Sequence, residues 1–171
     1  MGKAMKTEKG RRAIGAVKIA VIVVCLATVI ISATFFAVRS ILKAEFPMKY
    51  QDKISLYAET YGVPEDLLYG VIHTESGYDE KAKSHAGAIG LTQITPETFL
   101  WLQTKTGENL PEEALYDADT SVKYCAVFYG LLLKEFGGDE KTAIAAYHAG
   151  RGQVNAWLRD PDISPDGKTL V

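Results

Sequence analysis

Glu75 is the acidic residue whose position best suits acid–base chemistry. It follows Val71 by four residues and Leu67 by eight, a spacing that puts its carboxylate on the apolar stripe of a predicted helix. The stripe ends at Gly77, so Glu75 falls in the last turn, where the helix dipole disfavours negative charge. Partial burial and the dipole both raise a carboxyl pKa, as a general acid near neutral pH requires. On position alone, however, most acidic residues on helices are simply solvated.

The elements that must position this carboxylate are predicted to be helices. Beyond the first fifty residues, apolar side chains recur at helical spacing in five or six segments, most of them closed by glycine. Thr95 and Pro96 predict a helix start with threonine as the N-cap. Asp119 or Thr120 is predicted to cap a longer helix, and Asp139 to open the next. Because alternation at period two is absent from the sequence, we expect a mainly α, compact helical domain.

The N-terminal part of the chain is predicted to be a membrane anchor. Residues 19–38 are twenty consecutive uncharged residues, enough to span about 30 Å of hydrocarbon. Six lysines and arginines precede this run against one acid, which favours a cytoplasmic N-terminus. The run is longer than the apolar core of a cleavable signal peptide and lacks a small-residue cleavage site. We therefore expect a single-pass signal anchor with the rest of the chain outside the cell membrane.

These observations divide the chain into four segments. They are a cytoplasmic basic tail (1–18), a transmembrane anchor (19–38), a linker (39–49) and a helical domain (50–171). Pro47 is predicted to break any continuous helix from the membrane into the domain.

Charge and cysteine content exclude two classes of protein. From Ala44 onward there are 11 Lys and Arg against 20 Asp and Glu, a net charge of −9, which argues against binding nucleic acid. Cys25 lies in the predicted membrane span and Cys125 outside it, so the two cysteines cannot form a disulfide framework. Cys125 has apolar and aromatic neighbours and is predicted to be a small core residue.

Three short sequence blocks, the first of which begins with Glu75, bear on the role of this residue. Glu75-Ser76-Gly77-Tyr78 is followed by Gly-Ala-Ile-Gly-Leu-Thr-Gln-Ile-Thr-Pro-Glu-Thr at 87–98 and by Ala-Ala-Tyr-His-Ala-Gly at 145–150. In order and separation they resemble the signature blocks of soluble-lytic-transglycosylase (SLT) domains. The resemblance runs from about residue 50 to residue 158, and three blocks in order are far more specific than one.

The resemblance implies a lysozyme-like fold and cleavage of the β-1,4 bond between N-acetylmuramic acid and N-acetylglucosamine in peptidoglycan. By motif, Glu75 is implied to be the acid/base, and Ser84 to orient the glutamate or the N-acetyl group. Gln93 and Tyr147 match a substrate-binding glutamine and an active-site tyrosine. His148 stands in the third block and is expected to contact substrate. Without the resemblance, Ser84, Gln93 and Tyr147 would be read as a loop residue, a surface polar group and a core residue.

The chain departs from the family pattern in three places. Thr92 replaces a methionine in the second block, and His148 replaces an asparagine in the third. An imidazole can still donate or accept one hydrogen bond, so we expect His148 to keep part of the amide's role. The family continues past Val171 with a segment that carries another tyrosine, which leaves open a fragment or a truncated product.

A single acid is enough if the substrate supplies the nucleophile. The mechanism that the resemblance implies uses the acetamido group and the C6 hydroxyl of the muramic acid ring, and yields a 1,6-anhydro product. One alternative is a lysozyme-type hydrolase with a second carboxylate from Asp79, Glu80 or Glu97. Another is a non-catalytic peptidoglycan-binding or assembly protein.

Metal and cofactor chemistry are not expected. His73, Glu75, His85 and His148 show no familiar zinc spacing, and His73 and Glu75 would face different sides of their helix. The expected partners are the glycan strands of peptidoglycan, the membrane, and a wall-remodelling or secretion machine; no nucleic acid and no cofactor are expected.

Overall fold

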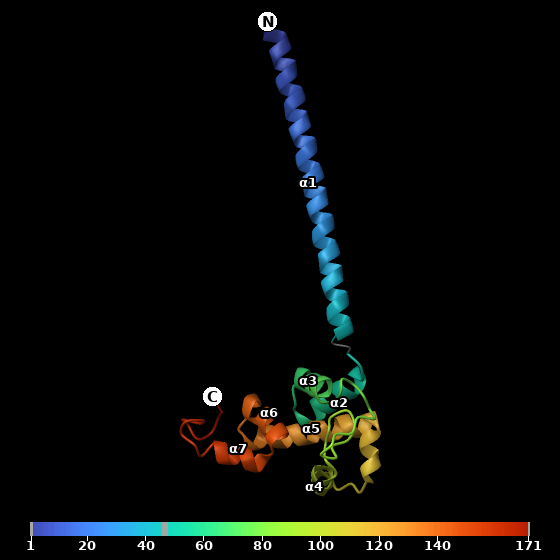
Figure 1. Ribbon diagram of the computed structural model, residues 1–171, viewed down its shortest axis with the longest axis vertical. Coiled ribbons are helices and arrows are strands. Elements are labelled where there is room, and N and C mark those ends of the chain that lie inside the picture. Colours follow the sequence, from blue (N-terminus) through green and yellow to red (C-terminus); the bar gives the residue numbers. More distant parts are fainter. Residues whose placement is uncertain (1, 46–47, 171) are drawn as a thin grey trace. The chain divides into compact units, whose positions relative to one another are not determined.

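The computed structural model describes residues 2–45 and 48–170, and the chain splits into two compact units, Met1–Pro47 and Met48–Val171. In the first unit α1 (Gly2–Glu45) is one continuous helix (Figure 1). Its stretch Val21–Ala44 has a mean hydropathy of 2.8 and is the one helix among the described residues that is long and apolar enough to cross a bilayer. The helix therefore includes residues assigned above to the linker, and Pro47, predicted to break it, lies outside the described residues.

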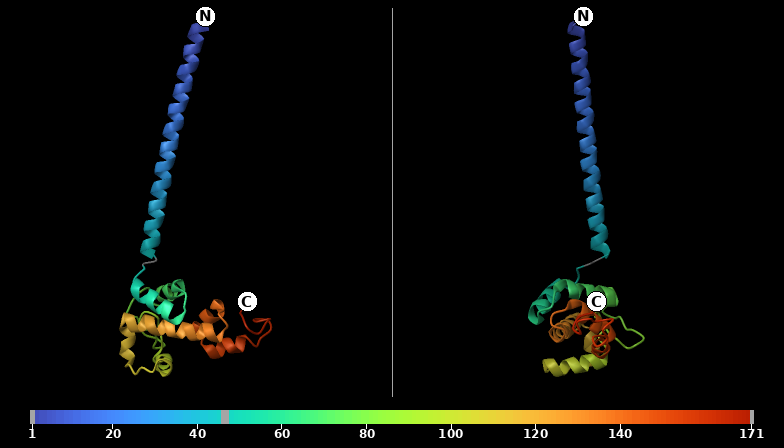
Figure 2. Two further views of the ribbon diagram at one scale, coloured as in Figure 1. Left: turned by 180° about the vertical axis from the view of Figure 1, so that it is seen from behind. Right: turned by 90° about the vertical axis from the view of Figure 1, so that its left-hand side faces the viewer.

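The regular elements in the described part of the second unit are helices, joined by turns and two isolated bridges, which confirms the predicted fold class. Its elements are α2 (Gln51–Tyr61), α3 (Glu65–Ser76), α4 (Pro96–Thr106), the 3₁₀ helix η1 (Glu112–Tyr116), α5 (Ala118–Glu135), α6 (Glu140–Ala149) and α7 (Arg151–Trp157). The short helix η1 was not predicted. Helix α5 contacts α2, α3, α4, α6 and η1. It lies between α2 and α3 on one side and α4 on the other (Figures 1 and 2).

The core forms around α5 because this helix is apolar on nearly every side. Tyr124 and Tyr129 are fully buried, and the ring of Phe99 from α4 meets Tyr124 edge-on at 4.5 Å. Gly130 gives α2 room to approach, since a Cβ there would lie 2.9 Å from the carbonyl oxygen of Tyr61. The central helix thus fixes the position of the elements that carry the candidate site.

Side-chain caps set where α4, α5 and α6 begin. Thr95 accepts a hydrogen bond from the N–H of Thr98 at 3.2 Å, and Asp139 caps α6, as predicted. The predicted cap of α5 was wrong by two or three residues, because Asp117 and not Asp119 or Thr120 accepts the bond that begins this helix. Asp119 instead binds Lys53 and Tyr57 of α2, so a tertiary contact takes the carboxylate that sequence suggested as a cap.

The segment between α3 and α4 is held by isolated bridges and one close approach. Ile89 pairs with Lys83 and with Ile94. Gly90 has a φ of 75°, and a Cβ at this position would overlap the backbone carbonyl of Leu115 in η1. Only glycine fits such a conformation and such a contact. The turn that carries the second sequence block is therefore pressed against η1.

Candidate active site

Glu75 lies in the last turn of α3, as predicted. Leu68, Val71 and Ile72 of this helix are buried in the core, and Glu75 follows Val71 by one turn. Gly77 ends the helix with a φ of 58° and an N–H bonded to the carbonyl of His73. This cap is the left-handed glycine end common to helices, and it fixes the turn from which the carboxylate projects.

Burial raises the pKa of the Glu75 carboxyl above its ordinary value of 4.5, and the nearby His148 opposes part of that rise. The Glu75 side chain is only 19% exposed, so water solvates its charged form poorly. A carboxyl with a raised pKa holds its proton nearer to neutral pH. It is therefore suited to act as a general acid.

His148 is the direct partner of Glu75. Its Nδ1 lies 3.0 Å from Oε1 of Glu75, although 73 positions separate the two residues. Helix α6 brings it there by burying Ala143 and Ala146, which leaves His148 in the last turn with 46% of its side chain exposed. His148 of the third sequence block thus contacts the carboxyl group of Glu75, the first residue of the first block.

Tyr147 joins the third block to the second. Its hydroxyl donates a hydrogen bond to the backbone carbonyl of Thr92 at 2.6 Å, and its ring stacks on that of Tyr129 at 4.6 Å. Burial raises the pKa of Tyr147 well above its usual value, and that of the neighbouring Cys125 thiol to about 12. Both groups are therefore neutral near Glu75 at physiological pH.

Thr92, which departs from the family pattern, faces the core. Its side chain is fully buried, and its hydroxyl lies 3.0 Å from that of Ser121 on α5. A buried hydroxyl needs such a partner, because an unpaired one destabilises the fold. The replacement of methionine is thus accommodated by a polar contact inside the domain.

Ser84 and Gln93 bond the backbone of their own loop. The Ser84 hydroxyl accepts from the N–H of Ala88 at 3.0 Å, and the Gln93 amide donates to the carbonyls of Gly90 at 3.0 Å and Ala82 at 3.3 Å. No hydrogen bond or ion pair joins either side chain to Glu75 within residues 48–170. Of the five predicted site residues, the structure brings Glu75 and His148 into contact with each other, with Tyr147 beside His148 on α6. The substrate roles of Ser84, Gln93, Tyr147 and His148 remain predictions.

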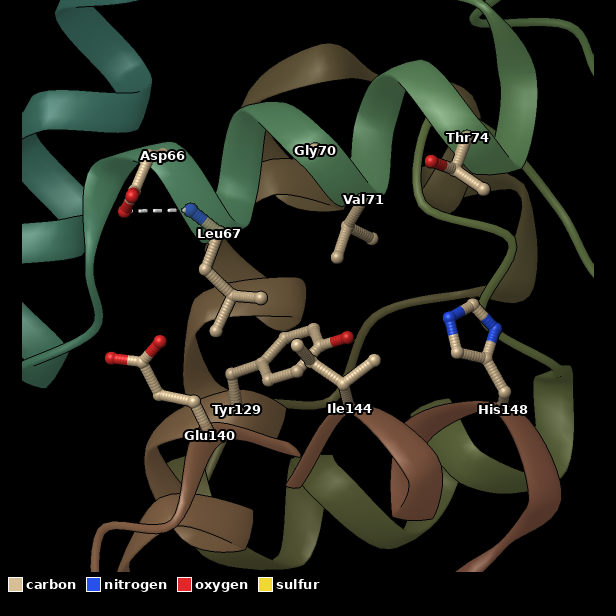
Figure 3. A pocket seen from close by; sticks show the side chains of 9 residues that line it. All are labelled: Asp66, Leu67, Gly70, Val71, Thr74, Tyr129, Glu140, Ile144 and His148. Carbon is tan, nitrogen blue, oxygen red and sulfur yellow. Dashed lines mark hydrogen bonds between the residues drawn. The ribbon is translucent and has the colours of Figure 1, made fainter. Parts of the chain in front are cut away.

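A groove of about 330 Å³ runs between α3 and α6 and reaches His148 (Figure 3). Its floor is Tyr129 of α5, and Asp66 and Glu140 lie at the end away from His148. The lining residues are Asp66, Leu67, Gly70, Val71, Thr74, Tyr129, Glu140, Ile144 and His148. A partly apolar groove that reaches His148, the contact partner of a carboxyl with a raised pKa, has the features of a ligand site.

A match to a family model identifies the family of this chain. A family model described as "Transglycosylase SLT domain" matches residues 52–168. The chain belongs to this family. The match covers the second unit from α2 to the segment beyond α7, and it includes all three sequence blocks.

Similar proteins support the assignment to the SLT family. The chain is 30% identical over 120 residues to the soluble lytic murein transglycosylase of Escherichia coli K12, which covers 68% of this chain and 18% of that protein. It is 30% identical over 116 residues to the membrane-bound lytic murein transglycosylase C of Haemophilus influenzae PittEE, covering 62% and 32%. The solved structure of an inactive mutant of lytic transglycosylase Slt from Pseudomonas aeruginosa has a TM-score of 0.67 and 29% identity, covering 70% and 20%. The chain therefore spans a fifth to a third of the length of these relatives, and it shares their lysozyme-like helical domain.

Tyr129 lines the groove, and sequence reasoning did not single it out as a site residue. Its hydroxyl is buried without a hydrogen-bond partner among the described residues. Burial is the main cause of its raised pKa, and the nearby charge of Glu75 adds to it. The signal lay in the spacing, because Tyr129 follows Cys125 by one helical turn on the face that meets Tyr147.

Proposed function

We propose that this chain is a peptidoglycan lytic transglycosylase that cleaves the bond between N-acetylmuramic acid and N-acetylglucosamine. The observation that carries the proposal is Glu75, a mostly buried carboxyl with a raised pKa beside a groove, in a domain of the SLT family. Relatives named as murein transglycosylases support the substrate class.

The reaction needs one acid that later acts as a base. Protonated Glu75 gives its proton to the glycosidic oxygen as the bond from that oxygen to C1 of muramic acid breaks. The 2-acetamido group of the same sugar stabilises the positive charge at C1. The C6 hydroxyl then bonds to C1, and ionised Glu75 takes the hydroxyl proton. The products are a 1,6-anhydro sugar and a free N-acetylglucosamine end, Glu75 is protonated again, and no water is consumed.

Two of the three carboxylates named for a lysozyme-type hydrolase have other partners. Glu80 accepts a hydrogen bond from the Tyr50 hydroxyl at 2.8 Å, and Asp79 accepts one from the N–H of Lys81 at 2.9 Å. Glu97 is exposed in the first turn of α4. These contacts favour structural roles for Asp79 and Glu80, which supports the mechanism with one carboxylate.

The anchor confines the enzyme to wall close to the membrane. We assign residues 1–18 to the cytoplasm, 19–38 to the span, 39–49 to the linker and 50–171 to the domain on the outer face. Basic residues before the span and the apolar stretch Val21–Ala44 support this topology. Cutting next to the bilayer suits a wall-remodelling or secretion machine.

The test is digestion of purified peptidoglycan by the full chain in detergent micelles, followed by mass spectrometry of the products. The wild type is expected to release muropeptides, and Glu75→Gln to release at least about 100-fold less because the proton donor is lost. Glu59→Gln is the matched control, since Glu59 is an exposed carboxylate on α2. Equal release by the Glu75→Gln variant would overturn the proposal. Retained binding of peptidoglycan without any release by the wild type would support the non-catalytic alternative.

A further inference from the structure

The contact between Glu75 and His148 has a consequence for how the acid is kept protonated. We infer that His148 is a positioning residue that shares one proton with Glu75 and yields it to the carboxylate when sugar covers the site. The inference rests on the proposed function, because it concerns the acid of that reaction. An asparagine at position 148 could hold the carboxyl in place but could not carry a proton for it.

The two side chains form a close ion pair when the imidazole is protonated. Oε1 of Glu75 and Nδ1 of His148 are 3.0 Å apart, a separation over which two groups can share a proton. Both residues lie in the last turns of their helices, and each helix buries its apolar face in the core. With the shared proton on Nδ1, His148 is an imidazolium and Glu75 a carboxylate. With the proton on Oε1, both groups are neutral.

The two partners differ in their access to water. The His148 side chain is 46% exposed, whereas that of Glu75 is 19% exposed. Histidine is also the side chain whose charge changes most readily between about pH 5 and pH 8. In the open site, solvent thus reaches the imidazole more easily than the carboxyl, and His148 is the member through which a proton enters the pair.

Substrate binding shifts the proton toward Glu75. A sugar ring over the pair removes water, which disfavours two charged groups more than two neutral ones. The proton then moves from Nδ1 to Oε1, leaving a neutral imidazole and a carboxylic acid, with no change in the total charge of the pair. From Oε1 it passes to the glycosidic oxygen, and the proton of the C6 hydroxyl restores the pair.

Neighbouring titratable groups leave the charge of the pair undisturbed. From α5 the Cys125 thiol and the Tyr129 hydroxyl lie near Glu75, and on α6 the ring of Tyr147 lies 5.8 Å from that of His148. Burial raises the pKa of all three groups, so they are neutral under working conditions. The carboxylates of Asp66 and Glu140 line the far end of the groove (Figure 3).

The first test compares the pH dependence of cleavage in the wild type, His148→Asn and His148→Gln. Two groups that share a proton lose the last one at a higher pH than a lone carboxyl does. The wild type therefore keeps more of its activity than either variant as the pH rises, so the ratio of wild-type kcat/KM to that of either variant is expected to be larger at pH 8 than at pH 5. A purely structural role for His148 would lower kcat/KM by the same factor at every pH, and that result would overturn the inference.

The second test does not depend on cleavage. The carboxyl carbon of Glu75 is followed by NMR during a pH titration of the full chain in micelles, with carbon-13 glutamate and Glu75→Gln for assignment. Two titration steps are expected in the wild type, and one step at a higher pH than the first in His148→Asn, because the imidazolium that favours the carboxylate is gone. A single unshifted step in both proteins would overturn the inference. If the wild type shows two titration steps but releases no muropeptides, the result contradicts the proposed function and not the inference about His148.

Discussion

The hydroxyl of Tyr147 donates a 2.6 Å hydrogen bond to the backbone carbonyl of Thr92, and so ties α6 to the turn that precedes α4. Tyr147→Phe removes the donor and leaves a backbone carbonyl without its partner. We expect the free energy of unfolding to fall by about 1–3 kcal/mol, as for other buried groups left unpaired. Urea unfolding followed by circular dichroism measures the change.

Tyr129→Phe is the matched control for that prediction. The Tyr129 ring stacks on Tyr147, but its hydroxyl is buried without a partner among the described residues. Removing an unpaired polar atom relieves an unfavourable burial, so stability is expected to stay within about 0.5 kcal/mol of the wild type or to increase. If Tyr129→Phe proved more destabilising than Tyr147→Phe, the assigned hydrogen bond would not be the one that matters.

Gly90→Ala is expected to be strongly destabilising. The residue has a positive φ of 75°, and a methyl group there would overlap the carbonyl of Leu115. Strain and overlap together should lower the free energy of unfolding by about 3 kcal/mol or more. Gly152→Ala serves as the control, since Gly152 lies within α7 with open space around its Cβ position, and alanine there should stabilise by about 0.5–1 kcal/mol. Equal effects of the two substitutions would contradict the close packing of the turn on η1.

Glu75→Gln is expected to stabilise the protein at neutral pH. Because burial raises the pKa of Glu75 above 4.5 in the folded state, the folded protein binds this proton more tightly than the unfolded chain does. The free energy of unfolding therefore falls as the pH rises from about 4.5 through the folded pKa, and His148 reduces this loss without reversing it. Glutamine carries no charge at any pH, so the Glu75→Gln variant does not lose this stability as the pH rises.

Thermal unfolding at two pH values measures this effect. At pH 7 the melting temperature of Glu75→Gln should exceed that of the wild type, and at pH 4 the difference should shrink, since the wild-type carboxyl is then largely protonated. The exposed Glu59→Gln should leave the melting temperature nearly unchanged at both. A larger gain at pH 4 than at pH 7 would mean that the pKa of Glu75 is lowered.

Local features of the sequence predicted local features of the fold. The caps Thr95 and Asp139 were found because a side chain that bonds an N–H three residues on acts within one turn. The cap of α5 was misplaced because Asp119 is held by Lys53 and Tyr57, and no local signal reveals a partner more than sixty residues away. The helix η1 has five residues and too little periodicity to be recognised.

The position of Glu75 in its helix was predictable from sequence, whereas its contacts were not. The spacing of Glu75 from Val71 placed the carboxylate on the buried side of α3. The contact with His148 and the groove floor at Tyr129 depend on how α3, α5 and α6 pack, which sequence spacing does not determine. The sequence assigned His148 to sugar binding, whereas the structure adds a direct partnership with the acid.

The central claim, that Glu75 drives a transfer to the C6 hydroxyl and not to water, is tested most directly by oxygen labelling. Peptidoglycan is digested by the full chain in water enriched in oxygen-18, and the released muropeptides are weighed by mass spectrometry. The account predicts 1,6-anhydro-muramic acid ends that carry no label, and their loss in Glu75→Gln. Reducing ends that carry one labelled oxygen for each bond cleaved would show that water is the nucleophile and would contradict the account.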